Sequence, residues 1–365
     1  MKTWIGLMSG TSMDGIDAIL VSFDGQKIQV HNTHTTPYPD DIRQRLFNLS
    51  QNRGTPDDIG ELDHTVGSLF ALAAATVIEK SGFQASSVTA IGSHGQTLRH
   101  HPDSATPFSL QIGDPTIIAE RTGVTTVADF RRRDLAAGGE GAPLVPAFHK
   151  TFFSVAGEDR CILNLGGIAN ITHLPADKNE PVTGFDTGPA NALMDAWCLD
   201  QTGRAFDKDG SWAEEGEVNQ ALLGDMLSDA YFLRQPPKST GTEKFNLEWI
   251  KTQLRRHSEL SGADVQRSLL ELTAVSVAQQ LPQATGMTIF ACGGGAKNRA
   301  LMGALQRTCG PARIASTADL GLDPQWVEPA AFAWLASQTL SGKPGNLPEV
   351  TGARGKRILG AVYYV

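Results

Sequence analysis

The stretch LMSGTSMDGID, residues 7–17, decides how the first part of the chain is expected to fold. An apolar run enters it over Thr3–Met8 and an alternating apolar run leaves it over Ala18–Phe23, which predicts two strands joined by a turn. A plain hairpin needs only a two-residue turn. This turn is longer and carries two glycines, two hydroxyl side chains and Asp14. Because glycines let several backbone N–H groups point at one anion, it is either a polar hairpin loop or an anion-binding loop.

The same pattern recurs in the second half of the chain. Asp159–Leu165 is an apolar run, Gly166 and Gly167 follow it, and Ile168–Leu174 then nearly alternates. This again predicts a strand, a glycine turn and a second strand. A Gly-Gly turn between strands is common, but two such hairpins, one in each half, are able to bind a polyphosphate from both sides.

The segments around these hairpins alternate between helix and strand patterns. Apolar residues at helical spacing predict a helix over Ile59–Lys80, and a further helix is expected over Arg267–Gln280. Short apolar runs predict buried strands over Val88–Ser93, Val124–Ala128 and Thr288–Ala291. Such alternation is typical of α/β domains.

The length of 365 residues favours two domains over one. A boundary is expected near residues 130–145, where a charged run is followed by glycines and prolines. We expect an N-terminal domain over residues 1–132 and a C-terminal domain over residues 133–350. The final residues, 351–365, end in a strand-like run that is able to join either domain, and we expect it to complete the first.

Composition excludes several classes of protein. A formal net charge of −8 argues against a non-specific nucleic-acid binder. The N-terminus is neither a signal peptide nor a membrane span, and no later apolar run reaches spanning length, so we expect a cytoplasmic protein without a membrane partner. The four cysteines are widely spaced, which fits a reducing compartment, and no cysteine–histidine cluster predicts a zinc site.

The stretch TGFDTGPAN, residues 183–191, places Asp186 ahead of an expected helix. Pro189 suits the first helical position, with Thr187 or Gly188 as the cap. The positive end of the helix would then favour ionised Asp186, and an ionised carboxylate is a candidate general base. The alternative is that Asp186 is itself the capping residue.

The stretch CGGGAKN, residues 292–298, follows a predicted buried strand. Gly293, Gly294 and Gly295 are expected to lead into a helix, an arrangement that suits a nucleotide at a helix N-terminus. The pattern nearly matches a dinucleotide-binding fingerprint, but Asn298 replaces its last glycine and the expected acidic residue is missing. The alternative is a strand-to-helix connection without a ligand.

Four further polar residues are candidates for contact with a ligand. His94 and Gln96 follow a buried strand and are expected on a loop, where they either touch a ligand or form a solvated turn. Arg131 belongs to a run of three arginines, and such a run usually faces solvent. The alternative is that the Arg131 side chain points toward an anionic or hydroxylated substrate. Glu328 either binds substrate or caps the helix that Pro329 is expected to begin.

Together these stretches resemble the actin-like ATPase and sugar-kinase superfamily, and more specifically the anhydro-N-acetylmuramic acid kinase family. The resemblance implies an α/β, two-domain actin-like ATPase (ribonuclease H-like) fold, with duplicated strand-rich cores around an interdomain cleft and nucleotide-binding elements in the C-terminal domain. A small departure is Ala190, where glycine is the commoner residue. The stretches that carry the resemblance are GLMSGTSMDGID, GSHGQT, ADFRRRD, GGEGAPLVPAFH, NLGGIANIT, GFDTGPANALMD, CGGGAKN and LPEVTGA.

The resemblance also implies roles for individual residues. Asp186 is implied to be the general base, and Asp14 to lie near Mg²⁺. The residues implied to bind ATP lie in three glycine-rich turns: Gly10, Thr11, Ser12, Met13, Asp14, Gly15, Ile16, Asp17, Gly166, Gly167, Gly293, Gly294, Gly295 and Asn298. The residues expected to contact an amino-sugar substrate are all polar: His94, Gln96, Arg131, Asn191 and Glu328.

The activity implied by the resemblance is ATP-dependent opening of the 1,6-anhydro bond of 1,6-anhydro-N-acetylmuramic acid with phosphorylation of O6. The product is N-acetylmuramic acid 6-phosphate, formed in peptidoglycan recycling, and the family also implies a homodimer. Two alternatives remain at this stage. One is a kinase for a different, open sugar within the same superfamily, and the other is an ATP-gated nucleotide switch.

Overall fold

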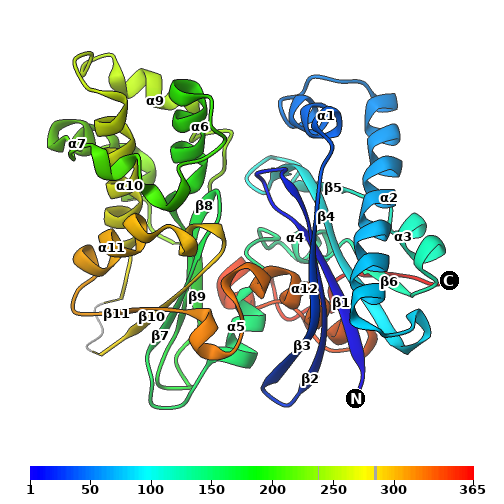
Figure 1. Ribbon diagram of the computed structural model, residues 1–365. Helices are drawn as coiled ribbons and strands as arrows, with labels where there is room; N and C mark the ends of the chain where they lie inside the picture. Colours follow the sequence, from blue (N-terminus) through cyan, green and yellow to red (C-terminus); the bar gives the residue numbers. More distant parts are fainter. Residues whose placement is uncertain (237, 283–285) are drawn as a thin grey trace. The chain divides into compact units, whose positions relative to one another are not determined.

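The computed structural model describes residues 1–236, 238–282 and 286–365 (Figure 1). The chain forms two compact units, the first from Met1–Phe153 and Trp326–Val365 and the second from Ser154–Gln325. Among the described residues, no helix combines the length and apolar character that crossing a bilayer requires.

Seven strands form the sheet of the first unit, in the order β12-β6-β4-β1-β2-β3, with β5 paired to β4. Strands β1, β2 and β3 are antiparallel neighbours, whereas β1, β4 and β6 are parallel. The C-terminal strand β12 pairs antiparallel with β6 and so belongs to this unit. The strands are β1 (Thr3–Ser9), β2 (Gly15–Asp24), β3 (Lys27–Pro37), β4 (Val88–His101), β5 (Phe108–Ile112), β6 (Thr126–Ala128) and β12 (Ala361–Tyr363).

The sheet of the second unit repeats this topology in the order β11-β10-β7-β8-β9. Strands β7, β8 and β9 are antiparallel neighbours, and β7, β10 and β11 are parallel. The repeated order confirms the predicted α/β class with duplicated strand-rich cores. The strands are β7 (Arg160–Leu165), β8 (Ile168–Leu174), β9 (Thr183–Pro189), β10 (Thr288–Cys292) and β11 (Arg313–Ser316).

Helices cover both faces of the first sheet. Ile5 and Leu7 of β1 belong to the same buried cluster as Leu62, Val66 and other residues of α2, and α12 packs on β1 and β4 from the opposite face. A capping box at Thr55 and a left-handed Gly82 bound α2. The helices of this unit are α1 (Asp40–Ser50), α2 (Pro56–Ser81), α3 (Pro115–Thr122), α4 (Arg132–Ala136), α5 (Pro146–Phe153), α12 (Val327–Leu340) and α13 (Pro348–Thr351).

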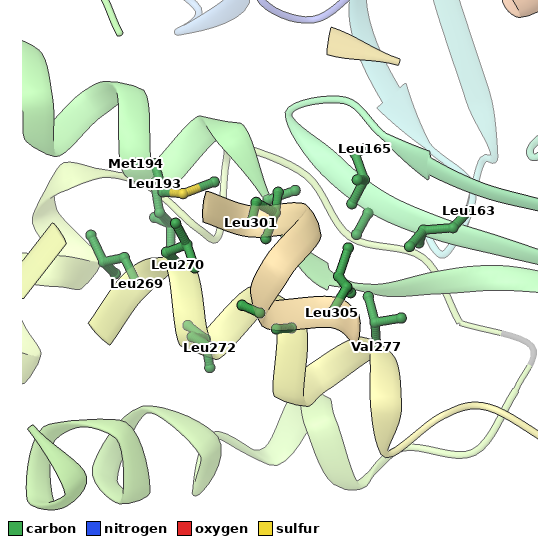
Figure 2. Packing of buried hydrophobic residues seen from close by; sticks show 14 of the residues in the cluster. Leu163, Leu165, Leu193, Met194, Leu269, Leu270, Leu272, Val277, Leu301 and Leu305 are labelled. Carbon is green, nitrogen blue, oxygen red and sulfur yellow. The ribbon is translucent and has the colours of Figure 1, made fainter. Parts of the chain in front are cut away.

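Figure 2 shows the core of the second unit, where leucines of β7 meet side chains of three helices. Burial of these apolar surfaces stabilises the unit by about 25 cal/mol per Å² removed from water. The predicted helix at Arg267–Gln280 begins earlier, because Ser261 and Asp264 form a capping box. The helices are α6 (Asn191–Thr202), α7 (Gln220–Leu227), α8 (Ala230–Leu233), α9 (Leu247–Leu254), α10 (Gly262–Ala278) and α11 (Arg299–Thr308).

The limits of the two units differ from the predicted limits of residues 1–132 and 133–350. Residues 133–153 and 326–350 lie with the first unit, because α12 packs on its sheet and α5 packs on α12. The buried Asp134 carboxylate also accepts hydrogen bonds from Asn346 Nδ2 (2.7 Å) and Thr351 Oγ1 (2.9 Å). These contacts join segments that are far apart in the sequence, so composition alone could not place the limits.

Glycine at position 6 allows α12 to lie against β1. A Cβ built at Gly6 would lie 1.7 Å from the Pro329 carbonyl oxygen, whereas a Cβ at Gly60 in α2 meets nothing within 4 Å. We expect Gly6→Ala to lower the free energy of unfolding by about 3 kcal/mol through overpacking. Gly60→Ala, the matched control, will raise it by about 0.5–1 kcal/mol through helix propensity. Urea denaturation measures both, and equal stability of the two variants would contradict the close packing.

Candidate functional site

The turn after β1 exposes polar groups of the first unit. Met13 N donates to Gly10 O (3.2 Å), and the Met13 side chain is buried in the core although its φ of 52° is left-handed. Thr11 and Ser12 are exposed, and Ser12 Oγ donates to Asp14 Oδ1 (2.8 Å). Hydroxyl donors beside an exposed carboxylate are suited to bind phosphates together with a divalent cation.

Two buried side chains, those of Ser9 and Gln96, form hydrogen bonds at the backbone of this turn. Ser9 Oγ lies 2.7 Å from both the Gly15 carbonyl oxygen and Gln96 Oε1, and its single proton bonds one of them at a time. Gln96 Nε2 donates to Gly10 O (3.1 Å). The buried Gln96 amide therefore fixes the backbone of the turn.

The prediction that His94 and Gln96 lie on a loop is wrong. Strand β4 continues through both residues to His101, and both side chains are buried. The strand is long because β1 pairs with its first part and β5 with its last part, as far as the His101–Phe108 pair. The sequence after Ser93 lacks the apolar alternation that would have announced this pairing.

His94 and Arg131 contact each other directly. Arg131 Nη2 lies 2.8 Å from His94 Nε2, and Arg131 Nη1 donates to the Gly141 carbonyl oxygen (2.9 Å). A guanidinium only donates, so His94 Nε2 accepts and the imidazole is neutral. Burial, and then the Arg131 charge, hold the pKa of His94 well below its usual range.

Arg131 and Asp17 both lie within electrostatic range of Glu328. Burial raises the pKa of the Glu328 carboxyl; Arg131 opposes this shift and Asp17 adds to it. Glu328 does not cap α12, because it lies inside the first turn of the helix and Trp326 is the capping residue. The structure thus gathers Asp17, His94, Arg131 and Glu328 into one polar cluster of the first unit.

The glycine turn of the second unit receives the start of α6. Asn191 N donates to Gly166 O (3.1 Å) and Ala190 N donates to Gly167 O (2.9 Å). Asn191 Nδ2 also donates to Leu165 O (2.9 Å). Asn191, which the sequence predicts to bind substrate, thus joins the start of α6 to the turn.

The predicted helix start at Pro189 is wrong, and so is the cap assigned to Thr187 or Gly188. Strand β9 continues to Pro189, and the capping position is Ala190, whose methyl side chain makes no capping hydrogen bond. Thr187 Oγ1 instead donates to Ala169 O (3.2 Å) within the sheet. Asp186 accordingly lies inside β9, and the argument from the helix dipole does not apply to it.

Asp186 lies on an edge strand and is bound by a separate segment. Its backbone N–H donates to Lys238 O (3.2 Å), and its carbonyl oxygen accepts from Tyr231 Oη (2.7 Å). Its Oδ2 accepts a hydrogen bond from Thr240 N (3.0 Å). These three partners could not be predicted from the sequence, because no spacing or pattern relates Asp186 to residues about fifty positions away.

Gly293 and Gly295 allow the turn after β10 to lie against β7. A Cβ at Gly293 would lie 2.4 Å from Asn164 Oδ1, and one at Gly295 would lie 2.7 Å from Leu165 Cβ. The helix does not follow the glycines directly: a short 3-10 turn, Gly294–Lys297, precedes α11. Asn298 caps α11, with its Oδ1 accepting from Leu301 N (3.0 Å).

The carboxylate at the first turn fits a shared magnesium site better than a protein-only site. Across residues 1–236, 238–282 and 286–365, no three His, Cys, Asp or Glu side chains gather as a metal cluster. Magnesium bound with a nucleotide takes most of its ligands from phosphates and water, with one or two carboxylates from the protein. The exposed Asp14, bonded to Ser12, meets that requirement.

A family model described as anhydro-N-acetylmuramic acid kinase matches residues 2–365. The chain belongs to this family, which confirms the resemblance predicted from its motifs. It is 49% identical over 369 residues to the anhydro-N-acetylmuramic acid kinase of Coxiella burnetii (strain Dugway 5J108-111), covering 100% of this chain and 98% of that relative. It is also 49% identical over 362 residues to the enzyme of the same name from Shewanella halifaxensis, covering 99% of this chain and 98% of the relative.

More distant similarity extends to solved structures. A ROK family glucokinase from Streptomyces griseus, in complex with glucose and AMPPNP, aligns with a TM-score of 0.42 at 14% identity. The alignment covers 91% of this chain and 99% of that protein.

The Arg131 charge accounts for part of the lowered pKa of His94. In Arg131→Met we expect the pKa of His94 to rise, because a positive neighbour that disfavours protonation is lost. Long-range ¹H–¹⁵N NMR of the imidazole measures this titration. Arg133→Met, at an exposed neighbouring position, is the control and leaves it unchanged. An unaltered His94 titration in Arg131→Met would refute the assigned contact.

Proposed function

We propose that this protein uses ATP to convert 1,6-anhydro-N-acetylmuramic acid into N-acetylmuramic acid 6-phosphate. The observation that carries the proposal is the family match over residues 2–365, together with relatives 49% identical that are named for this kinase. Conversion requires hydrolysis of the 1,6-anhydro bond and phosphorylation of O6 on the same sugar.

Asp186 is the proposed general base. Thr240 N bonds one carboxylate oxygen, and the hydrogen bonds of the Asp186 backbone hold the residue in place, so the carboxylate is presented in a fixed orientation. Water attacks the anomeric carbon while Asp186 takes its proton. The electron pair of the C1–O6 bond passes to O6, which attacks the γ-phosphorus of ATP, so the bond from that phosphorus to the β–γ bridging oxygen breaks and ADP leaves. Asp186 then releases its proton to solvent. No separate general acid is needed, because O6 departs toward phosphorus, unlike the leaving group of an inverting glycosidase.

The glycine turns are the proposed phosphate-binding elements. The turn from Gly10 to Asp17 and the turn at Gly166–Gly167 would provide backbone N–H donors, which favour the charge that spreads over a transferring phosphoryl group. Gly293–Gly295 and Asn298 would lie beside the adenosine. Their observed structural roles are compatible with this, since a turn fixed by packing and a cap is preorganised for a ligand.

Asp14 is the proposed residue at Mg²⁺, which when bound neutralises phosphate charge. In the first unit, the polar cluster of Asp17, His94, Arg131 and Glu328 is proposed to contact the sugar. Its charges of both signs suit a substrate that carries hydroxyls, an amide and a carboxylate.

Substitution at Asp186 tests the assignment of the base. We expect Asp186→Asn to lower kcat by about 10³-fold, because the amide cannot accept the proton from water. Product formed with ATP, Mg²⁺ and the anhydro sugar in ¹⁸O-labelled water is followed by mass spectrometry. The wild type will give a 6-phosphate that carries one ¹⁸O at the anomeric position when quenched promptly. Asp177→Asn, an exposed position of the same unit, is the matched control and retains the wild-type rate.

Two other results would change the functional conclusion. If ATP is consumed only with an open sugar, the protein is a kinase for a different sugar of the same superfamily. If no sugar is phosphorylated although ATP binds, the turns serve a nucleotide switch.

Substitution at Asp14 tests the metal assignment. We expect Asp14→Asn to raise the Mg²⁺ concentration needed for half-maximal rate by about tenfold, because a charged oxygen ligand is lost. Steady-state rates over a magnesium titration measure the change. Asp24→Asn, an exposed carboxylate of the same unit, is the control. An identical magnesium dependence in Asp14→Asn and wild type would remove Asp14 from the site.

We also propose that the protein acts as a homodimer in the cytoplasm, within peptidoglycan recycling, with no nucleic-acid partner. Membership of the kinase family supports this proposal. Sedimentation equilibrium tests the dimer directly, and a monomer at micromolar concentration would refute it.

A further inference from the structure

Lys238 is a cation buried beside aromatic side chains. Its side chain is 2% exposed, and among the described residues its Nζ has no hydrogen-bond acceptor. The Nζ lies 4.9 Å from the centre of the Tyr231 ring and 5.9 Å from that of Phe185. Aromatic faces attract a cation, but they do not replace the hydration that an ammonium loses on burial. A further interaction is therefore needed to stabilise the buried positive charge of Lys238.

The backbone at Lys238 and Thr240 makes hydrogen bonds with Asp186. Lys238 O accepts from Asp186 N, and two positions later Thr240 N donates to Asp186 Oδ2. Tyr231, whose ring lies under the Lys238 ammonium, donates its hydroxyl proton to Asp186 O. Lys238 thus makes one of the two backbone hydrogen bonds that join this segment to Asp186, and both residues contact Tyr231.

The charges around Lys238 identify its electrostatic partner. Burial lowers the pKa of Lys238, Arg234 lowers it further, and Asp186 opposes both effects. The other lysine at the Tyr231 ring, Lys244, is paired with Asp229 at 2.6 Å. The carboxylate that favours the charged form of Lys238 is therefore Asp186. The attraction is mutual, so the ammonium equally favours an ionised Asp186.

We propose that Lys238 is a positioning residue for the catalytic step, which keeps the Asp186 carboxylate ionised and correctly oriented to accept a proton from water. The inference rests on the proposed function of Asp186. Lys238 itself contacts no substrate atom in this role, and it acts through the charge and the backbone geometry of Asp186.

Two substitutions separate the charge of Lys238 from its packing. Lys238→Met keeps an unbranched, flexible side chain that fills the same apolar surroundings, and replacing a buried ion by an apolar group is often tolerated. Lys238→Arg keeps the charge. The pH dependence of kcat/KM reports ionisation of the free enzyme. We expect its acid limb to move to higher pH by about one unit in Lys238→Met and to stay near the wild-type position in Lys238→Arg.

The control is Lys251→Met, which removes an exposed lysine of α9 in the same unit and leaves the profile unchanged. A uniform loss of activity at every pH in Lys238→Met would indicate packing alone and would overturn the proposal. A rise in sugar KM with an unmoved acid limb would also overturn it, because Lys238 would then bind the substrate carboxylate.

An independent readout is the titration of Asp186 by ¹³C NMR of its carboxyl carbon, with the resonance assigned by its loss in Asp186→Asn. The midpoint is expected to rise in Lys238→Met by the same amount as the acid limb. If Asp186→Asn remains fully active, the proposed function of Asp186 fails. If Asp186→Asn is inactive but Lys238→Met moves neither the midpoint nor the acid limb, only the role of Lys238 fails.

Discussion

The glycine turns after β1 and β7 depend on hydrogen bonds that other segments donate to their carbonyl groups. In the first unit the Gln96 amide donates to Gly10 O, and in the second the backbone of Ala190 and Asn191 donates to Gly167 and Gly166. A glycine-rich turn loses much conformational entropy when it is ordered, so it takes one shape only where such contacts offset the loss. The proposed phosphate contacts rely on this order, because N–H donors stabilise a developing charge only when they are already in place.

The two units share one sheet topology, but different groups form the hydrogen bonds to their glycine turns. In the first, the support for the turn is a side chain from a neighbouring parallel strand, whereas in the second it is the start of a helix. The second sheet also ends at β9, whose outer edge carries Asp186. An edge strand has backbone groups that its own sheet does not satisfy. The Lys238–Thr240 segment makes hydrogen bonds with that edge, and one of them gives the carboxylate of the proposed base a fixed N–H donor.

The accuracy of the sequence predictions depended on how local each interaction is. The hairpin strands at Thr3–Met8 and Ile168–Leu174 were predicted closely, because alternation records which face is buried. The helix start at Pro189 was wrong, since pairing between β8 and β9 outweighs the preference of proline for a first helical turn. His94 and Gln96 were assigned to a loop because the last part of β4 is a strand only through its pairing with β5. That partner lies in a separate segment of the chain, so the sequence around His94 does not indicate it.

By itself the sequence determined the α/β class, the two strand–turn–strand cores and the kinase family, because periodicity and contiguous motifs are properties of neighbouring residues. Tertiary structure alone decided that α12 completes the first unit, that Gln96 supports the first turn and that Lys238 accompanies Asp186. Each of these depends on residues separated by tens to hundreds of positions. Such pairs produce no periodic pattern in the sequence. They are brought together by the topology of the fold and by packing, and not by their spacing along the chain.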